Sequence, residues 1–504
     1  MKKPTLTNER FASGGIIILF TLFLFIMRNG YFGLAKTRFI TFCAVAVTTA
    51  VLCAVARLSQ RNKVRSACPK GARLSGAALA AMTVSAAASA VLSEYGRSAL
   101  TGGDGRYRGL ITYLAIAAVF FAIKRNYRLR FAEIAVFMAS GSVLCGFAFV
   151  QFLGFDPFGL LSQIELPERN MFISFTGNVN VFASFVCLFA PAAMYVFCKS
   201  DGRGRRLTGF AASCLGFLGL FSANSDSGWL GMAAAFAVLG CISLGERKSA
   251  VRFYALTALF FVAAAVFAGA VGSMQNARTP TFITATVTNP RVSLTAAAVC
   301  AVMLLISAII HKDGFFRGLR AAYSALAICA AVSLVFAFVY FSFINTSAEL
   351  GRFRDYLRFG SGWGTDRGYV WRCVIEDFKA QPVIRKLFGV GCDCAAPELL
   401  SRFGDSFAND LGYYFDNAHN EYLQYLLTVG LSGLAFYLIF LISSVSVGFA
   451  RAEKDALFGA PALAVTAYAV QAAVNTDQII TTPLVFVLCA MVCCASTAGK
   501  PLKS

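Results

Sequence analysis

Long apolar runs recur along the whole chain and constrain its fold more than any other feature of the sequence. A helix of roughly 20 apolar residues crosses the hydrocarbon core of a bilayer, because it satisfies its own backbone hydrogen bonds there. The runs therefore predict an all-α, polytopic transmembrane bundle of about fourteen helices. The expected spans are 11–27, 39–56, 75–92, 109–123, 131–154, 181–198, 207–221, 228–245, 253–272, 292–310, 321–344, 422–450, 457–474 and 479–494.

The distribution of charge gives the expected orientation of this bundle. The chain carries 45 Lys and Arg against 25 Asp and Glu, a net charge of +20 that could also indicate a nucleic-acid partner. If the N-terminus is cytoplasmic, however, the inner connections hold 27 basic and 7 acidic residues, and the outer ones hold 18 of each. This asymmetry is the positive-inside pattern of membrane proteins. We therefore expect both termini in the cytoplasm, the lipid bilayer as a partner and no nucleic acid.

Basic clusters in short connections carry most of this signal. The strongest consists of Arg57, Arg61, Lys63, Arg65, Lys70 and Arg73, and others lie at 124–130 and 199–206.

The lengths of the connections divide the chain into four parts. Residues 1–92 hold predicted helices 1–3, and 93–344 hold helices 4–11 with their outer loops. Residues 345–421 form a large extracytoplasmic loop, and 422–504 hold helices 12–14. Apolar side chains at helical spacing between Val370 and Phe378 predict a helix over 366–379 within that loop. We expect it to lie on the membrane surface or to cap the bundle.

His419 is the most distinctive candidate for chemistry. The predicted spans contain almost no ionisable groups except Glu133, which argues against an ion-coupled pump. His419 lies in the outer loop, immediately before the span at 422–450. A helix N-terminus and nearby arginines favour the neutral imidazole that can accept a proton, whereas Asp416 and Glu421 oppose this effect. A helix-capping role for His419 remains the alternative reading.

Arginines in the outer loops form the second group of candidates, because guanidinium binds phosphate oxygens in bidentate fashion. Arg354 and Arg358 are one turn apart, as are Arg367 and Trp371, so each pair can share a helix face if those stretches are helical. We expect only two or three of the eight to contact substrate. The arginines are Arg97, Arg106, Arg108, Arg352, Arg354, Arg358, Arg367 and Arg372.

Small polar motifs precede two of the spans. Asn178 and Asn180 lie before the sixth span, and residues 224–229 lie before the eighth. Each motif is equally typical of a helix cap or of a substrate site. Cys392 and Cys394 have no second Cys pair or His at ligand spacing, so we expect no metal and no cofactor.

The order of these motifs resembles that of the O-antigen ligase and polymerase family of membrane glycosyltransferases. The resemblance extends over roughly residues 90–440. It differs from the usual family pattern at Val179, where proline is common, and at Asp226, where a basic residue is common. The motifs are Gly-Gly-Asp-Gly-Arg-Tyr-Arg-Gly at 102–109, Gly-Asn-Val-Asn at 177–180, 225–231, Arg-Gly-Tyr-Val-Trp at 367–371, Phe-Gly-Val-Gly at 388–391, His-Asn-Glu-Tyr-Leu-Gln at 419–424 and Gly-Leu-Ser-Gly at 430–433.

The resemblance implies a metal-independent, inverting transferase in a bacterial cytoplasmic membrane. Its donor would be a glycan on undecaprenyl diphosphate, and its acceptor a hydroxyl on a lipid, a glycan or another molecule. His419 would be catalytic, and Arg106, Arg108 and Arg367 would bind the diphosphate. Further substrate contacts are expected among Arg97, Asn178, Asn180, Arg354, Arg358, Trp371 and Asn420. Polymerisation of lipid-linked repeats, transport of a lipid-linked glycan and a non-catalytic scaffold remain alternatives.

Overall fold

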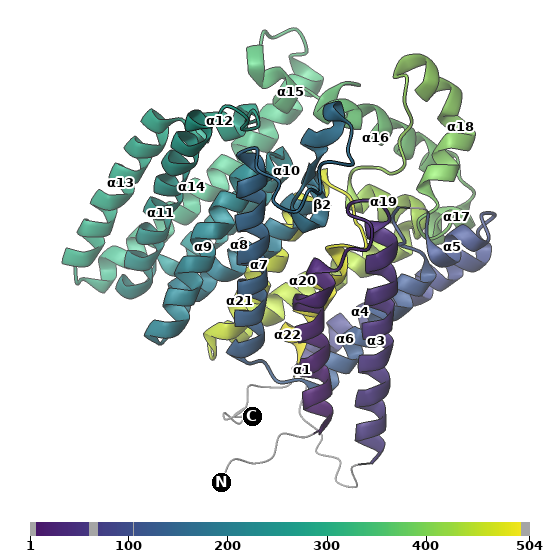
Figure 1. The fold of residues 1–504 in the computed structure, drawn as a ribbon, viewed down its shortest axis with the longest axis horizontal. Helices are drawn as coiled ribbons and strands as arrows, with labels where there is room; N and C mark the ends of the chain where they lie inside the picture. Colours follow the sequence, from purple (N-terminus) through teal and green to yellow (C-terminus); the bar gives the residue numbers. More distant parts are fainter. Residues whose placement is uncertain (1–6, 60–68, 104, 495–504) are drawn as a thin grey trace.

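The computed structural model describes residues 7–59, 69–103 and 105–494, and it confirms an all-α membrane bundle (Figure 1). Arg61, Lys63 and Arg65 of the strongest basic cluster, and Asp104 of the glycine-rich motif, lie outside these ranges. Within them, 12 helical segments are long and apolar enough to cross a membrane. They are α1 with α2 (Thr7–Phe20, Leu22–Phe25), α3 (Leu34–Leu58), α4 (Lys70–Leu92), α7 (Phe131–Phe152), α8 (Val179–Lys199), α9 (Arg203–Ala223), α10 (Asp226–Ser243), α11 (Arg247–Ser273), α13 (Pro290–Ile309), α14 (Asp313–Val339), α20 (Gly430–Ala452) and the continuous helical segment Ala456–Val474, which contains α21 (Gly459–Gln471).

The other two predicted spans are also helical but shorter. They are α6 (Leu110–Asn126), with 17 residues, and α22 (Thr482–Cys493), with 12 residues. Each of the fourteen predicted segments thus contains helix among the described residues. The remaining elements are α5 (Arg97–Thr101), α12 (Phe282–Thr288), α15 (Arg354–Leu357), α16 (Trp363–Ala380), α17 (Val383–Phe388), α18 (Ala395–Asp410), α19 (Glu421–Thr428) and a two-stranded antiparallel ribbon, β1 (Phe172–Ile173) and β2 (Gly177–Asn178).

Helix α8 lies at the centre of the bundle because it is apolar on all of its faces. Every residue from Val181 to Val196 is buried, and α8 packs against α9, α10 and α21. A helix without a polar face is stable in contact with other helices or lipid. In contrast, only 6% of the apolar stretch within Asp313–Ile344, which contains α14, is buried in the protein, as expected for a peripheral helix that faces lipid. The bundle therefore holds the start of α8, with Asn178 as its N-cap, in a rigid central position.

The large segment between α14 and α20 folds over one end of the bundle, which we call the loop end (Figure 1). Its helix α16 confirms the predicted helix over 366–379, although Gly364, Thr365 and Asp366 are non-helical. The start of α1 lies at the opposite end, where the Asn8 side chain bonds that of Asn126 at 3.0 Å. The loop end therefore gathers segments that are far apart in the sequence.

The predicted span at 422–450 is wrong as a single helix. It is divided into α19 and α20, because Gly430 has a φ of +72° that favours glycine. The amides of Val390 and Gly391 bond the carbonyls of Leu427 and Thr428 at 3.0 and 3.2 Å. A Cβ on Gly389 would lie 2.3 Å from the Thr428 backbone, so this contact depends on a second glycine. Consequently α19 belongs to the loop end, outside the spanning helices.

Arg354 and Arg358 do not share a helix face, because the stretch that holds them is helical only as far as Leu357. Helix α15 ends at Leu357, and Arg358 follows it in an extended conformation. The Arg358 guanidinium donates to the backbone carbonyl of Ala348, which ties the start of the large segment together.

Candidate functional site

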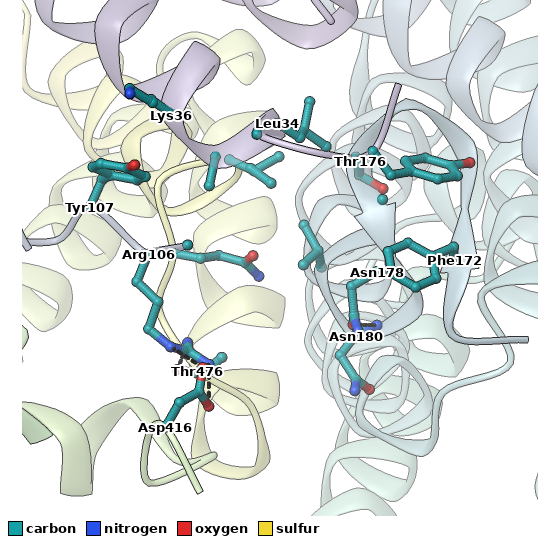
Figure 2. A pocket seen from close by; sticks show the side chains of 18 of the residues that line it. Leu34, Lys36, Arg106, Tyr107, Phe172, Thr176, Asn178, Asn180, Asp416 and Thr476 are labelled. Carbon is teal, nitrogen blue, oxygen red and sulfur yellow. Dashed lines mark hydrogen bonds and ion pairs between the residues drawn. The ribbon is translucent and has the colours of Figure 1, made fainter. Parts of the chain in front are cut away.

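A cavity of about 440 Å³ opens at the loop end, between segments from five parts of the chain (Figure 2). Figure 2 shows Arg106 extending to Thr476 and Asp416, while Asn178 and Asn180 lie across the cavity. Its wall is part polar and part apolar, which suits a ligand that has both a charged and a hydrocarbon portion. Its lining includes Tyr31, Leu34, Lys36, Arg106, Tyr107, Phe172, Thr176, Asn178, Asn180, Val181, Asp416, His419, Asn475, Thr476 and Ile480.

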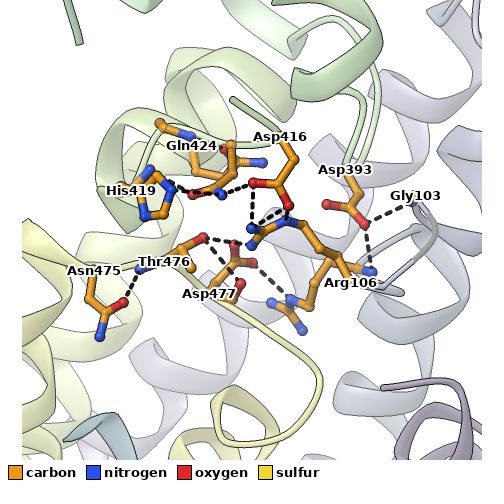
Figure 3. A network of polar contacts seen from close by, with 12 residues as sticks. Gly103, Arg106, Asp393, Asp416, His419, Gln424, Asn475, Thr476 and Asp477 are labelled. Atoms are coloured by element: carbon orange, nitrogen blue, oxygen red, sulfur yellow. Dashed lines mark hydrogen bonds and ion pairs between the residues drawn. The ribbon is translucent and has the colours of Figure 1, made fainter. Parts of the chain in front are cut away.

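The glycine-rich motif forms a tight loop that presents Arg106. Gly102 has a φ of +93°, and a Cβ there would lie 2.4 Å from the amide nitrogen of Arg108. The Asp393 carboxylate accepts hydrogen bonds from the amides of Gly103 and Arg108, at 2.9 and 3.0 Å (Figure 3). Asp393, between Cys392 and Cys394, thus has a structural role, because its carboxylate holds both ends of the glycine-rich loop.

Arg106 makes a bidentate ion pair with Asp416 in the cavity (Figure 3). Its Nε donates to Oδ2 of Asp416 at 2.9 Å, and its Nη2 donates to both carboxylate oxygens at 2.7 and 2.8 Å. The third nitrogen, Nη1, donates to the Thr476 hydroxyl at 3.2 Å. Asp416 and Thr476 thereby orient the guanidinium from two sides, while the Asp416 carboxylate remains exposed to solvent.

His419 lines the same cavity and is set up to be neutral. Its backbone amide donates to Oδ1 of Asn417 at 2.7 Å, so the nitrogen of that side-chain amide must face Nε2 of the ring, 3.4 Å away. This orientation assigns Nε2 as the acceptor and places the proton of the neutral ring on Nδ1, which is buried without a hydrogen-bond partner among the described residues. Burial, assisted by Arg367 and Arg106, lowers the pKa of His419 to about 4. At neutral pH the imidazole is thus free to accept a proton.

The hydrogen bond from Asn417 to the ring is long, so a closer donor can replace it. The backbone around His419 is held more firmly. Trp371 Nε1 donates to the Ala418 carbonyl at 2.8 Å, and the Ala418 amide donates to the Gln424 side chain at 3.0 Å. His419 itself has a φ of +47°, an uncommon value for a residue with a side chain. Trp371 thus positions the histidine segment from α16.

Arg367 lies on the α16 face that carries Trp371, as predicted from their spacing. Its Nη1 donates to the Val474 carbonyl at 2.7 Å. Burial lowers the pKa of Arg367, although a guanidinium remains protonated at neutral pH. Its charge acts on both His419 and Asp226. Arg367 is therefore a second cation close to the imidazole, although it does not line the cavity.

Arg108, two residues from Arg106, is directed into the protein interior and does not line the cavity. Its Nε donates to Asp477 at 2.8 Å, and its Nη2 donates to the Tyr425 hydroxyl at 3.0 Å. The exposed fractions of the two ion-paired side chains are 2% for Arg108 and 5% for Asp477. This buried pair joins the glycine-rich loop to the connection between α21 and α22.

Asn178 and Asn420 cap helices. The Asn178 side chain accepts from the amide of Asn180 at 2.8 Å, with Val179 at the first helical position where proline is also well accommodated. Asn420 accepts from the amides of Tyr422 and Leu423 at 3.0 and 3.1 Å. The cap of α19 is therefore Asn420 rather than His419. Asn178 and Asn180 also line the cavity.

Replacing Asn420 with alanine is expected to destabilise the protein by about 1 kcal/mol, because α19 loses its N-cap. Thermal unfolding of the purified protein in detergent measures this effect. The Asn420→Asp variant keeps an acceptor and serves as the control. An alanine variant as stable as the wild type would contradict the capping role.

A buried acidic network lies behind the cavity. Glu421 accepts hydrogen bonds from the hydroxyls of Tyr437 and Tyr468, at 2.7 and 2.8 Å. Burial and the nearby charge of Asp477 raise the pKa of Glu421 to about 7. The folded protein therefore holds a proton at Glu421 that the unfolded chain releases above pH 4.5.

This network predicts a stability that depends on pH. The contribution of Glu421 is complete below pH 4.5 and declines as the pH rises towards 7. Unfolding temperatures measured between pH 5 and 8 should fall less steeply for Glu421→Gln, whose side chain is neutral throughout. Parallel pH profiles for the variant and the wild type would contradict the assignment.

Five of the seven further substrate contacts predicted from the sequence do not line the cavity, namely Arg97, Arg354, Arg358, Trp371 and Asn420. Arg97 is exposed on α5, Arg354 is exposed on α15, and Arg358 binds Ala348. Lys36 and Thr476 line the cavity but were not predicted from the sequence. The ion pair between Asp416 and Arg106 was not predicted either. The connection between α21 and α22 could have been identified from the sequence. Asp477 is the single ionisable residue in this short connection between two apolar spans.

These features define a multi-pass helical membrane protein with a polar cavity that combines arginine, histidine and carboxylate side chains. A family model described as O-antigen ligase matches residues 280–438, a region that includes Arg367, Asp416 and His419. This part of the chain is therefore similar to the O-antigen ligase family, as its motifs predicted, and the similarity supports a membrane glycan-processing enzyme. A search of curated proteins finds no match to this chain.

Proposed function

We propose that the protein is an O-antigen ligase-like glycosyltransferase of a bacterial cytoplasmic membrane. It transfers a glycan from undecaprenyl diphosphate to an acceptor hydroxyl, with the loop end on the outer side and both termini in the cytoplasm. The observation that carries the proposal is the cavity in which the guanidinium of Arg106 and the neutral imidazole of His419 face the same space. The family match over the histidine segment supports it.

The proposed reaction is a single displacement at the anomeric carbon. The acceptor hydroxyl replaces Asn417 at Nε2 of His419 and gives its proton to the imidazole as its oxygen forms the new glycosidic bond. The bond from the anomeric carbon to the diphosphate breaks, and its electron pair leaves with the lipid diphosphate. Because attack and departure occur on opposite faces, the anomeric configuration is inverted.

Arg106 and Arg367 stabilise the charge on the departing diphosphate in this proposal, without an obligatory metal. Arg108 has a different role from the one expected from sequence. Since its guanidinium is buried against Asp477, we assign it to the support of the glycine-rich loop. Trp371 likewise positions the histidine segment through Ala418.

A transfer assay with purified protein and a synthetic undecaprenyl-diphosphate glycan tests the site. Arg106→Ala should lower transfer by about 10- to 1000-fold, because charge developing on the leaving group loses a preorganised donor. Arg97→Ala, an exposed arginine outside the cavity, is the matched control and should retain activity. Equal activity of both variants would refute the assignment of Arg106.

The polymerase alternative uses the same chemistry with a second lipid-linked glycan as acceptor. Product length separates the two, since a ladder of repeat units indicates polymerisation and one added glycan on a different acceptor indicates ligation.

A further inference from the structure

Among the described residues, the glycine-rich loop carries two Arg–Asp ion pairs, and they differ in how readily their partners can be exchanged. In the pair between Arg108 and Asp477, both side chains are buried, so separation would leave an uncompensated charge in the interior. In the pair between Arg106 and Asp416, the side chains are 17% and 61% exposed. Separating this pair is easier than separating the buried one, because water already solvates the Asp416 carboxylate.

Asp416 also occupies the part of Arg106 that a diphosphate would use. Its two oxygens accept hydrogen bonds from Nε and Nη2, which is the bidentate geometry of guanidinium with phosphate. A diphosphate cannot bind this edge of the guanidinium while the carboxylate is in place. Moving Asp416 towards solvent is a small change, since its carboxylate is already largely exposed.

Asp416 is connected to His419 through one side chain. Nδ2 of Asn417 donates to Oδ1 of Asp416 and also lies 3.4 Å from Nε2 of His419. The same asparagine accepts from the His419 amide at 2.7 Å. Displacement of Asp416 therefore alters the hydrogen bonding of Asn417, whose side chain contacts the ring nitrogen of His419.

We propose that Asp416 is a positioning residue that serves as the resting counter-ion of Arg106 and is displaced by the diphosphate of the incoming donor. This inference rests on the proposed function, because it assumes a diphosphate-bearing ligand. The exchange of one anion for another at Arg106 keeps its charge neutralised in both states. It also frees Asn417 to reorganise, so that donor binding prepares Nε2 of His419 for the acceptor hydroxyl.

The affinity of the full-length protein for inorganic pyrophosphate tests this exchange at low ionic strength. Asp416→Asn removes the competing carboxylate with little change of shape, so the Kd for pyrophosphate should fall about two- to fivefold. Asp405→Asn, an exposed aspartate on α18, controls for the change in net charge and should leave the Kd near its wild-type value. Asp416→Ala provides a second variant with the same expected direction.

A role for Asp416 in merely holding Arg106 in place predicts the opposite result, because its loss would then weaken binding. An unchanged or higher Kd in both Asp416 variants would overturn the inference. Adding Arg106→Ala to Asp416→Asn should abolish the gain, and a gain that persists would also overturn it. Glycan transfer by the wild type is measured separately, and absence of transfer would count against the proposed function. The pyrophosphate affinities test only whether an anion displaces Asp416 from Arg106.

Discussion

Replacing His419 with alanine should lower the rate of glycan transfer by about 10²- to 10⁴-fold, the contribution typical of a positioned general base. The loss should appear in kcat, because the imidazole acts on the acceptor proton while the arginines that bind the donor remain. At neutral pH the wild-type ring is in its base form, since burial lowers the pKa of His419 to about 4. Steady-state kinetics with a fixed acceptor measure the effect.

The matched control for this variant is His311→Ala, because His311 is the second of the chain's 2 histidines and lies in the connection before α14. It should transfer glycan at the wild-type rate. A His419→Ala variant with full activity would show that the acceptor loses its proton elsewhere.

Replacing Arg108 with methionine should destabilise the folded protein by about 3–5 kcal/mol, because Asp477 would remain buried without its cation. The same change would release the glycine-rich loop from the α21–α22 connection, so activity should fall together with stability. Denaturant unfolding in detergent measures the loss.

The double variant Arg108→Met with Asp477→Leu distinguishes the effect of an unpaired charge on stability from the effect of altered packing. Removing both partners avoids an uncompensated charge, and stability should recover to a large extent. If the single variant is as stable as the wild type, the buried pair does not support the fold as described.

The spanning helices could be predicted from the sequence because their signal is local. Each apolar run is sufficient to specify a helix in a bilayer, and α8 and α14 follow from their own residues. The break between α19 and α20 could not be predicted in this way. It depends on the contact of Gly430 and Thr428 with Leu387 and Gly389, some 40 residues earlier, which no periodicity reveals.

The positions of the site arginines likewise could not be predicted from local sequence. Arg106 and Arg108 look equivalent in the sequence, with the same side chain in one glycine-rich motif. Their different positions are decided by partners far along the chain, since Asp416 is 310 residues and Asp477 is 369 residues away. The residue types suggested a site for an anion, whereas the choice of which arginine faces the cavity required the fold.

The most direct test of the account is to identify both products of a reaction containing purified protein, an undecaprenyl-diphosphate glycan and an acceptor in a bilayer nanodisc. The account predicts one new glycosidic bond of inverted configuration for each undecaprenyl diphosphate released. Movement of intact lipid-linked glycan across proteoliposomes without formation of a bond, or release of the glycan as a sugar phosphate, would contradict it.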